Sequence, residues 1–417
     1  MIREDFATGP QRHRVFKILS EILRLCGFGG FTSKPPTGAP PSIWRAFLKG
    51  YPARLSLAFL LALYFVSLFA GFIAPYHYSS QDRRAPLCPP SRLHFIDSEG
   101  QFHLRPFIYR VRLIDPMTMA YAEDTSKRYP IEFFVKGESY LLFGFIESSR
   151  HLIGVAGKDD LETPPRFYLF GADVLGRDIF SRAIWGSQMP LFVGPLGLLL
   201  AFSIGILLGS ISGYLGGTVD AVFMRFAEVV LSLPALFLIL ALRTAFPLSV
   251  SPLQVASMML IIFSAVGWAE ISRIVRGMVL SLKNSEYVQS AVAMGANNRW
   301  IIARHILPNL LPVIVVQATL TIPTFILAEV SLSFLGVGVQ EPTASWGTML
   351  ASAQEVATLK ANAWVLAPGV FVLLTVLSFN VLGDRLRDAL DPRYRTNLGV
   401  TPVDDTVTQP IASGKIY

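Results

Sequence analysis

Long apolar runs alternate with polar segments along this chain, and their lengths indicate the fold class. Residues 55–74 carry no charged side chain, and twenty residues are enough to cross a hydrocarbon core of roughly 30 Å as a helix. Similar runs recur near 190–213, 221–246, 253–275, 308–335 and 364–383. With the first run, they predict an all-α polytopic membrane protein with six transmembrane helices.

The segment between the first two predicted spans has a different character. Residues 75–166 carry 12 Lys or Arg and 12 Asp or Glu, and they include the alternating stretch IEFFVKGESYLLFGFI. Alternation of this kind is typical of half-buried β-strands. We therefore expect a β-rich extracytoplasmic domain inserted between helices 1 and 2. Its scattered histidines lack the spacing of a metal site, so they are expected to be surface residues.

The expected organisation has five parts. They are a cytoplasmic N-terminal segment at 1–53, transmembrane helix 1 at 54–74, the inserted domain at 75–166, a core with helices 2–6 at 167–393, and a cytoplasmic tail at 394–417.

Composition and charge placement agree with this class. The chain is 52% hydrophobic and 16% charged, which is too apolar for a soluble globular protein. Its net charge of +7 is spread along the chain and forms no basic stripe, so a nucleic-acid partner is not expected. Residues 1–54 hold nine Lys or Arg against three acids, and residues 273–304 hold five Lys or Arg. This asymmetry places both termini and the second segment in the cytoplasm.

The N-terminal sequence indicates a retained anchor. The first apolar run begins only after about fifty polar and basic residues, so no cleavable signal peptide is expected. Cys26 and Cys88 fall on opposite sides of that first span, and no disulfide between them is expected.

A mostly polar stretch at 284–309, NSEYVQSAVAMGANNRWIIARHILPN, lies between two apolar runs and predicts two short helices and a turn. Ser285 is a candidate N-cap, Glu286 suits the positive end of a helix dipole, and Gly295 is the expected stop. Tyr287, Ala291 and Met294 share one face at spacings of four and three. Trp300 and His305 belong to the mixed apolar and basic surface of the second helix. One interpretation is an amphipathic loop lying on the bilayer surface.

The same stretch resembles the cytoplasmic coupling loop of ATP-binding-cassette (ABC) importer permeases. The residues that match the pattern of that loop are Ala291, Gly295, Ile302, Leu307 and Pro308, while Gln289 and Ser290 replace its glutamate and first alanine. GADVLGRDIFSRAIWG at 171–186 and SFLGVGVQEPTASWG at 333–347 resemble the dipeptide and oligopeptide branch of the family.

The resemblance implies a function and an assembly. The chain would be the permease subunit of a peptide importer in the cell inner membrane. Its partners would be a second homologous permease, two ABC ATPases that bind ATP and Mg²⁺, an extracytoplasmic peptide-binding protein, and membrane lipid. The coupling residues would be Glu286, Tyr287, Gln289, Ala291, Met294, Gly295, Trp300 and His305, with Tyr287, Ala291, Met294 and Trp300 as apolar anchors in an ATPase groove. The branch also includes carriers of nickel and of sugar-derived ligands, so the cargo stays open.

Residues late in the span after the coupling loop are further candidates, and an ionisable residue there is costly to bury in lipid. Glu329, Ser331 and Phe334 follow the coupling loop and are candidates for the translocation path, with packing at a subunit interface as the alternative for Glu329. Ion pairs are expected for Glu270 with Arg273, for Arg225 with Glu228, and along a helix face among Asp173, Arg177, Asp178 and Arg182. The small residues of the second span, Gly194, Gly197, Ala201, Gly205, Gly209 and Gly213, predict close helix packing.

The chain has no G-x-x-x-x-G-K-[ST] phosphate loop, zinc pattern or Gly-x-Ser-x-Gly motif. We therefore expect no catalytic residue, no metal site and no cofactor in this chain. One alternative is a single-chain secondary transporter or channel, although no convincing repeat supports it. Another is a membrane-anchored outer sensor, which leaves six spans unexplained. The inserted domain is expected either to dock the binding protein or to form a lid.

Overall fold

A computed structural model describes residues 47, 50–142, 144–155, 165–245, 251–354 and 362–390. Most of the predicted N-terminal segment, Cys26 and the predicted tail at 394–417 lie outside these residues.

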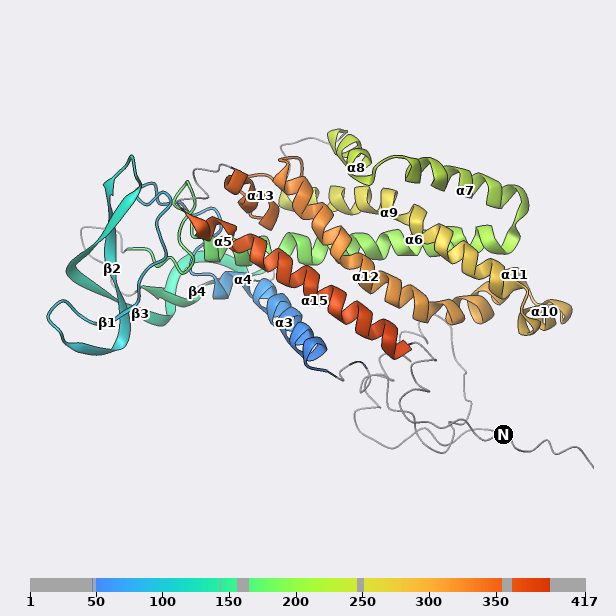
Figure 1. The fold of residues 1–417 in the computed structure, drawn as a ribbon, viewed down its shortest axis with the longest axis horizontal. Coiled ribbons are helices and arrows are strands. Elements are labelled where there is room, and N and C mark those ends of the chain that lie inside the picture. The colour runs from blue at the N-terminus through green and yellow to red at the C-terminus, as the bar shows by residue number, and fades with distance from the viewer. Residues whose placement is uncertain are drawn as a thin grey trace, which may run out of the picture.

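Helices make up most of the described chain (Figure 1). They are α3 (Tyr51–Leu68), α4 (Ala70–Ile73), α5 (Ile179–Gly186), α6 (Gly194–Leu215), α7 (Gly217–Ser232), α8 (Ala235–Thr244), α9 (Pro252–Lys283), α10 (Glu286–Ala293), α11 (Asn298–Ile301), α12 (Leu307–Phe334), α13 (Trp346–Ala351) and α15 (Ala367–Leu390). Short π-helical segments, Met189–Val193 and Ile302–Ile306, lead into α6 and α12, and 3-10 turns at Ser352–Gln354 and Ala363–Leu366 precede α15.

Five helical segments among the described residues are long and apolar enough to cross a membrane, namely Tyr51–Leu68, Ile179–Leu215, Pro252–Lys283, Asn298–Phe334 and Ala363–Leu390. A sixth span is reached only if α7 and α8 together count as one. The chain is therefore a multi-span membrane protein with five or six spans.

The pair α7 and α8 corrects the prediction of one uninterrupted span at 221–246. The two helices meet at an angle of 92°. Leu233 has extended backbone angles, and Pro234 follows it. Proline lacks an amide hydrogen and disfavours helical angles in the residue before it, so the helix ends there.

The small residues of α6 pack closely against neighbouring helices, as predicted, with Gly194 against Ile326 of α12 and the later glycines against α9. A Cβ added at Gly209 would lie 2.5 Å from the Ser272 carbonyl oxygen, and one added at Gly213 would lie 2.8 Å from the Arg276 carbonyl oxygen. Only glycine lets the two backbones approach this closely, because any side chain would collide with the facing helix. The close approach matters because lipid tails supply no hydrophobic drive, so van der Waals packing must hold the two helices together.

Between α4 and α5 lies a four-stranded antiparallel sheet in the order β1-β2-β3-β4. Its strands are β1 (His94–Ile96), β2 (Phe102–Asp115), β3 (Ala120–Leu142) and β4 (Ile146–Val155). The expected β-rich insertion is therefore present. Ile108, Tyr129 and Ile131 are buried in its small core together with Phe167.

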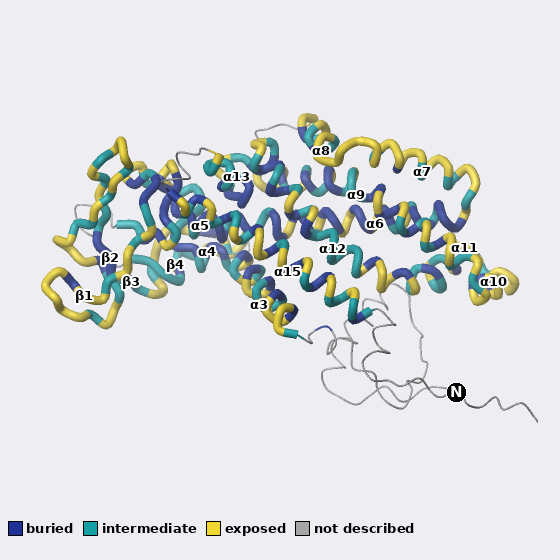
Figure 2. The backbone as a smooth tube through the Cα atoms, in the orientation of Figure 1, coloured by how far each residue is buried: buried dark blue, intermediate teal, exposed yellow. Residues whose placement is uncertain are grey.

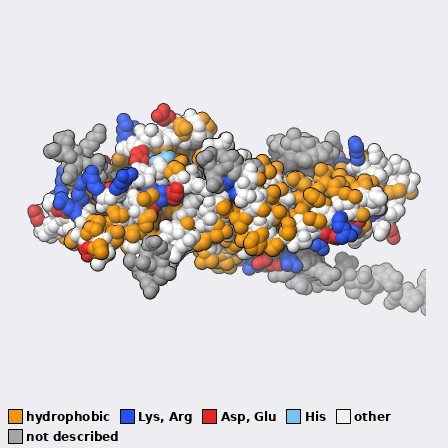
Figure 3. All heavy atoms as spheres, turned by 90° about the horizontal axis from the view of Figure 1, so that it is seen from above, with side chains coloured by type: hydrophobic (Ala, Val, Ile, Leu, Met, Phe, Trp, Pro, Cys, Tyr) orange, Lys and Arg blue, Asp and Glu red, His pale blue; other side chains and the backbone are white. Residues whose placement is uncertain are grey.

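The sheet and α10 lie at opposite ends of the helical body (Figure 1). Buried positions gather where the long helices face one another, whereas α7 and α10 are largely exposed (Figure 2). Hydrophobic side chains cover much of the helical body from above, while basic side chains gather over the sheet (Figure 3). This distribution is that of a membrane-embedded body with a polar region at each end.

Candidate functional site

The stretch 284–309 forms the two short helices and the turn that the sequence predicts. Gly295 has φ +80°, and an added Cβ would meet nothing within 4 Å. Its backbone angle therefore requires glycine, while the space around it does not. Ser285 does not cap α10 through its side chain, because its Oγ donates to the Leu282 carbonyl at 2.6 Å. The predicted capping bond is therefore wrong.

One side of α10 is fastened to the helical body. Val288 is 0% exposed and Ala291 is 1% exposed. Both belong to a buried cluster whose other members come from α6, α9, α11 and the start of α12, including Tyr214, Val279, Ile301, Ile306 and Leu310. The prediction that Ala291 is an anchor for a partner protein is therefore wrong, because its side chain already packs inside this chain. The sequence reasoning did not single out Val288.

The other predicted anchors face outward. Met294 is 80% exposed, Trp300 49% and Tyr287 42%. The His305 ring is near both aromatic rings, with its centroid 4.8 Å from that of Trp300 and 6.1 Å from that of Tyr287. Asn309 Nδ2 donates to the Tyr287 hydroxyl oxygen at 3.2 Å. The outer surface is therefore aromatic and apolar, with α10 and the start of α12 held together.

Hydrogen bonds of Gln289 and Lys283 hold the end of α9 in place. Gln289 Nε2 donates to the Lys283 carbonyl at 2.9 Å, which satisfies a carbonyl near the end of that helix. A glutamate has no hydrogen to donate when ionised, so the amide found here supports this contact better than the acid of the resembling pattern. Lys283 Nζ donates to the Tyr214 carbonyl at 2.6 Å, joining α9 to the end of α6. Glu286 lies in the first turn of α10, as predicted, and its side chain is exposed.

Glu329 lies near the other end of α12 and is fully enclosed. Its Oε1 accepts hydrogen bonds of 2.8 Å from Ser333 Oγ and Ser345 Oγ. Ser345 is the N-cap of α13, so the carboxyl group fastens α13 to α12. Ser331 and Phe334 are half-buried. The assignment of these three residues to a translocation path stays a prediction, and in this conformation Glu329 has no access to solvent.

The two motifs at 171–186 and 333–347 meet in space. Arg177 and Arg182 both bind the carboxylate of Glu341, with the Arg182 Nη2 to Oε1 distance at 2.9 Å. Trp346 Nε1 donates to the Ala183 carbonyl at 2.9 Å, and both residues are buried. We call Arg177, Arg182 and Glu341 the arginine clamp. Sequence reasoning missed Glu341, because its partners lie more than 150 positions earlier in the chain.

The predicted row of ion pairs along one helix face is wrong in this region. Asp173 and Arg177 pair at 2.7 Å, but both precede α5. Asp178 instead caps α5, accepting from Ser181 N at 2.8 Å. Burial raises the pKa of the Asp178 carboxyl group to about 6, although the hydrogen bonds that it accepts from Ser181 oppose this shift.

Of the other two predicted ion pairs, one forms and one does not. Arg225 and Glu228 pair at 2.9 Å, with side chains 81% and 54% exposed. Within the described ranges, Glu270 and Arg273 form no ion pair, and both are exposed. Cys88 is a buried free thiol, and burial raises its pKa to about 12. In the part of the chain that the structure describes, no group of three or more His, Cys, Asp or Glu side chains is placed to hold a metal ion.

Comparisons with known proteins match this architecture. Residues 205–396 match the family model described as "Binding-protein-dependent transport system inner membrane component". Residues 42–90 match "N-terminal TM domain of oligopeptide transport permease C". Neither match extends over residues 91–204, which hold the sheet and α5.

Similar curated proteins have peptide-transport names. The oligopeptide transport system permease protein OppC of Haemophilus influenzae is 42% identical over 230 residues, covering 55% of this chain and 71% of that protein. The dipeptide transport system permease protein DppC of Bacillus subtilis is 38% identical over 288 residues, covering 67% and 88%. OppC of Escherichia coli K12 is 43% identical over 232 residues, covering 55% and 73%.

Proposed function

We infer the working parts of this molecule from one premise, that the chain belongs to the family of binding-protein-dependent transport inner membrane components, among the oligopeptide and dipeptide permeases. It is the permease subunit of an ABC peptide importer. ATP and Mg²⁺ then belong to separate ATPase subunits, and the work of this chain is to turn their motion into movement of its membrane helices.

The surface of Tyr287, Met294 and Trp300 is the proposed docking surface for an ATPase subunit. The observation that supports it is the division of α10 into two sides. Val288 and Ala291 pack into the helical body, while Met294 stays 80% exposed at the tip. An apolar side chain left in water next to a firmly attached inner side is typical of a surface that a partner protein covers.

Movement at this surface would pass directly into three long helices. Lys283 joins α9 to the end of α6, and α11 continues through Ile302–Ile306 into α12. Closure of the two ATPases would therefore tilt α6, α9 and α12 together and bias the bundle between inward-open and outward-open arrangements.

The proposed orientation follows from the same reasoning. The end with α10 faces the cytoplasm, both termini are cytoplasmic, and the sheet at the opposite end faces outward, where it is placed to meet a peptide-binding protein. A second homologous permease completes the pathway. Peptides are the proposed cargo, in line with the names of the similar proteins.

Mild-detergent purification tests the docking surface. Met294→Glu places a charge in the proposed contact, and Met117→Glu is the matched control, because Met117 is 93% exposed at the turn between β2 and β3. The unmodified chain and Met117→Glu should co-purify with an ATPase and a second permease. Met294→Glu should keep the second permease and lose the ATPase. Retention of the ATPase, with normal stimulation by the binding protein, contradicts the proposal.

A further inference from the structure

The turn between β3 and β4 is apolar at its tip. Leu141 is 58% exposed, Phe145 75% and Ile146 47%. Exposed turns are normally built from polar residues and glycine, because their backbone and side chains face water. A hairpin tip with three large exposed apolar side chains is therefore expected to have a non-aqueous partner.

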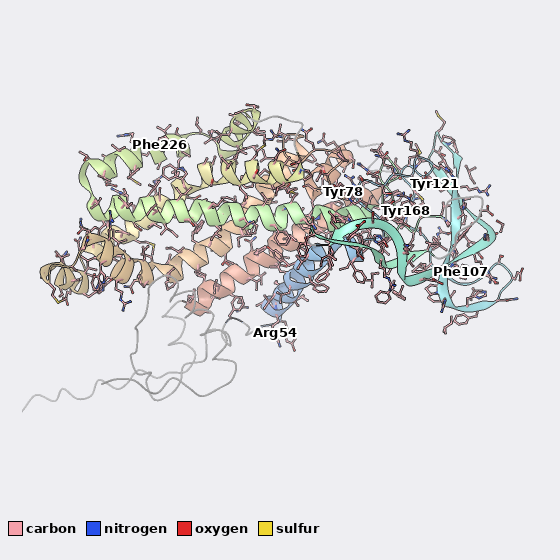
Figure 4. All side chains as sticks on the ribbon, turned by 180° about the vertical axis from the view of Figure 1, so that it is seen from behind. Arg54, Tyr78, Phe107, Tyr121, Tyr168 and Phe226 are labelled. Carbon is pink, nitrogen blue, oxygen red and sulfur yellow. The ribbon has the colours of Figure 1, made fainter. Side chains whose placement is uncertain are left out.

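The strand residues next to the tip pack against α4, at the end of the first span. Tyr140, directly before it, packs on α4 so closely that a Cβ added at Gly71 would lie 2.2 Å from its ring. His151 Nδ1 is 2.7 Å from the Ala74 carbonyl oxygen. At 1.5 Å per residue, Gly71 is about 25 Å along the helix from Arg54, within the roughly 30 Å of a hydrocarbon core. Figure 4 shows Arg54 at one end of α3 and Tyr78 at the other end of the first span, and Figure 1 shows β4 beside α4.

The surface next to the tip is also apolar and exposed. On α3, Leu61, Phe65 and Leu68 are 62%, 58% and 47% exposed, as expected for the outer side of a membrane helix. Phe134 of β3 continues this surface, because its ring lies 6.0 Å from that of Phe72 and it is 61% exposed. Phe134 has φ +58°, a backbone conformation that a bulky residue adopts only under constraint.

Two cations lie opposite each other farther up the hairpin. Lys136 pairs with Arg150 in the register of β3 and β4, and both are exposed. Among the described residues, neither side chain has a carboxylate at ion-pair distance. Like charges at directly opposed positions destabilise a strand pair unless an anion lies near. Arg150 is four residues from Ile146, or about 13 Å along β4.

We propose that the β3–β4 hairpin is a membrane anchor, whose tip residues Leu141, Phe145 and Ile146 enter the outer boundary of the bilayer while Lys136 and Arg150 bind lipid phosphate groups. The spacing fits, because interfacial segments bury their apolar side roughly 5–10 Å into the boundary between headgroups and acyl chains. Anionic headgroups attract basic side chains held at the surface. The anchor fixes the height of the sheet above the membrane, and it is independent of how the opposite end engages an ATPase.

Site-specific fluorescence in nanodiscs tests the anchor with the complete transporter. In a Cys26→Ser background, Phe145→Cys and the control Met117→Cys are labelled with an environment-sensitive dye. Cys88 is buried, so the unsubstituted background measures its residual labelling. The dye at position 145 should emit at shorter wavelength, lose intensity with nitroxide-labelled lipid and resist aqueous iodide. The dye at position 117 should show the opposite pattern.

Ile146→Cys provides a second position if labelling at 145 disturbs folding. Lys136→Glu combined with Arg150→Glu should reduce quenching by nitroxide lipid in discs that contain phosphatidylglycerol and leave it unchanged in pure phosphatidylcholine. Equal iodide quenching at positions 145 and 117 overturns the proposal, because the tip would lie in water. Protection from both quenchers also overturns it, because a protein surface would then cover the tip.

Discussion

Replacing Glu341 by glutamine isolates the arginine clamp. The change keeps the shape of the side chain and removes the negative charge that faces two guanidinium groups. The side chains of Arg177 and Arg182 are 6% and 1% exposed, whereas that of Glu341 is 46% exposed. After the change, Asp173 is the one carboxylate among the described residues that still pairs with these two arginines.

The expected cost lies between two limits. Removing one partner of a fully buried pair costs about 3–5 kcal/mol, while an exposed pair contributes about 1 kcal/mol or less. Because solvent reaches Glu341 but not the arginines, we expect about 2 kcal/mol. For a helical body of this size, that corresponds to a fall in melting temperature of roughly 2–5 °C.

The assay is thermal unfolding of the purified transporter at one fixed heating rate, which keeps the comparison valid if unfolding is irreversible. Glu228→Gln is the matched control, because its partner Arg225 is 81% exposed and the pair contributes little. Equal melting temperatures for the two variants would refute the reasoning, since the clamp would then add no more than an exposed pair.

Three further predictions concern the packing of α6 on α9, the turn after α10 and the stability of the inserted sheet. Gly209→Ala should lower the melting temperature, because its Cβ would lie 2.5 Å from the Ser272 carbonyl oxygen. The control Gly277→Ala, whose Cβ would meet nothing within 4 Å, should be neutral or stabilising by up to about 1 kcal/mol. Equal effects of the two changes would contradict the close approach of α6 and α9. Gly295→Ala should destabilise the turn by about 1 kcal/mol through its φ of +80° alone. Gly295→Asp should cost the turn a similar amount because the space is open, but it should lower ATPase activity stimulated by binding protein further, because the position is next to Met294 in the proposed ATPase contact. Equal losses of activity for the two variants would contradict that contact. The pKa of Asp97 is lowered, chiefly by its hydrogen bond with His103, so the stability it adds to the sheet is present above the unfolded pKa of about 3.9 and is lost as pH falls through the lower folded value. Pepsin cleavage within 94–155 should therefore rise on acidification in the unmodified chain, and an Asp97→Asn variant with the same pH dependence would contradict this role.

Features that depend on local sequence were predictable. The apolar runs predicted the membrane helices because a span must be apolar over its whole length. Alternation predicted strands at 131–146, and Gly295 predicted the turn after α10 because its backbone angle is a local property.

Features that depend on contacts between distant parts of the chain were not predictable from the sequence. Ala291 shares the spacing of Tyr287 and Met294, yet it is buried by residues of α9 and α12 that no periodicity in α10 reveals. Arg177 and Arg182 suggested local pairs, but their shared partner Glu341 comes from a loop after α12. Pro234 was the available signal for the bend between α7 and α8, and the apolar run around it concealed the break.

The lengths of α9 and of the segment Asn298–Phe334 have a consequence for the size of the assembled transporter. These segments contain 32 and 37 residues, or about 48 and 55 Å of helix. Both exceed a hydrocarbon core of roughly 30 Å, by about 18 and 25 Å, so part of each segment lies outside the bilayer. In the proposed orientation, the excess on the side of α10 sets the distance between the membrane and an attached ATPase, and removing one turn from both helices would shorten that distance by about 5 Å.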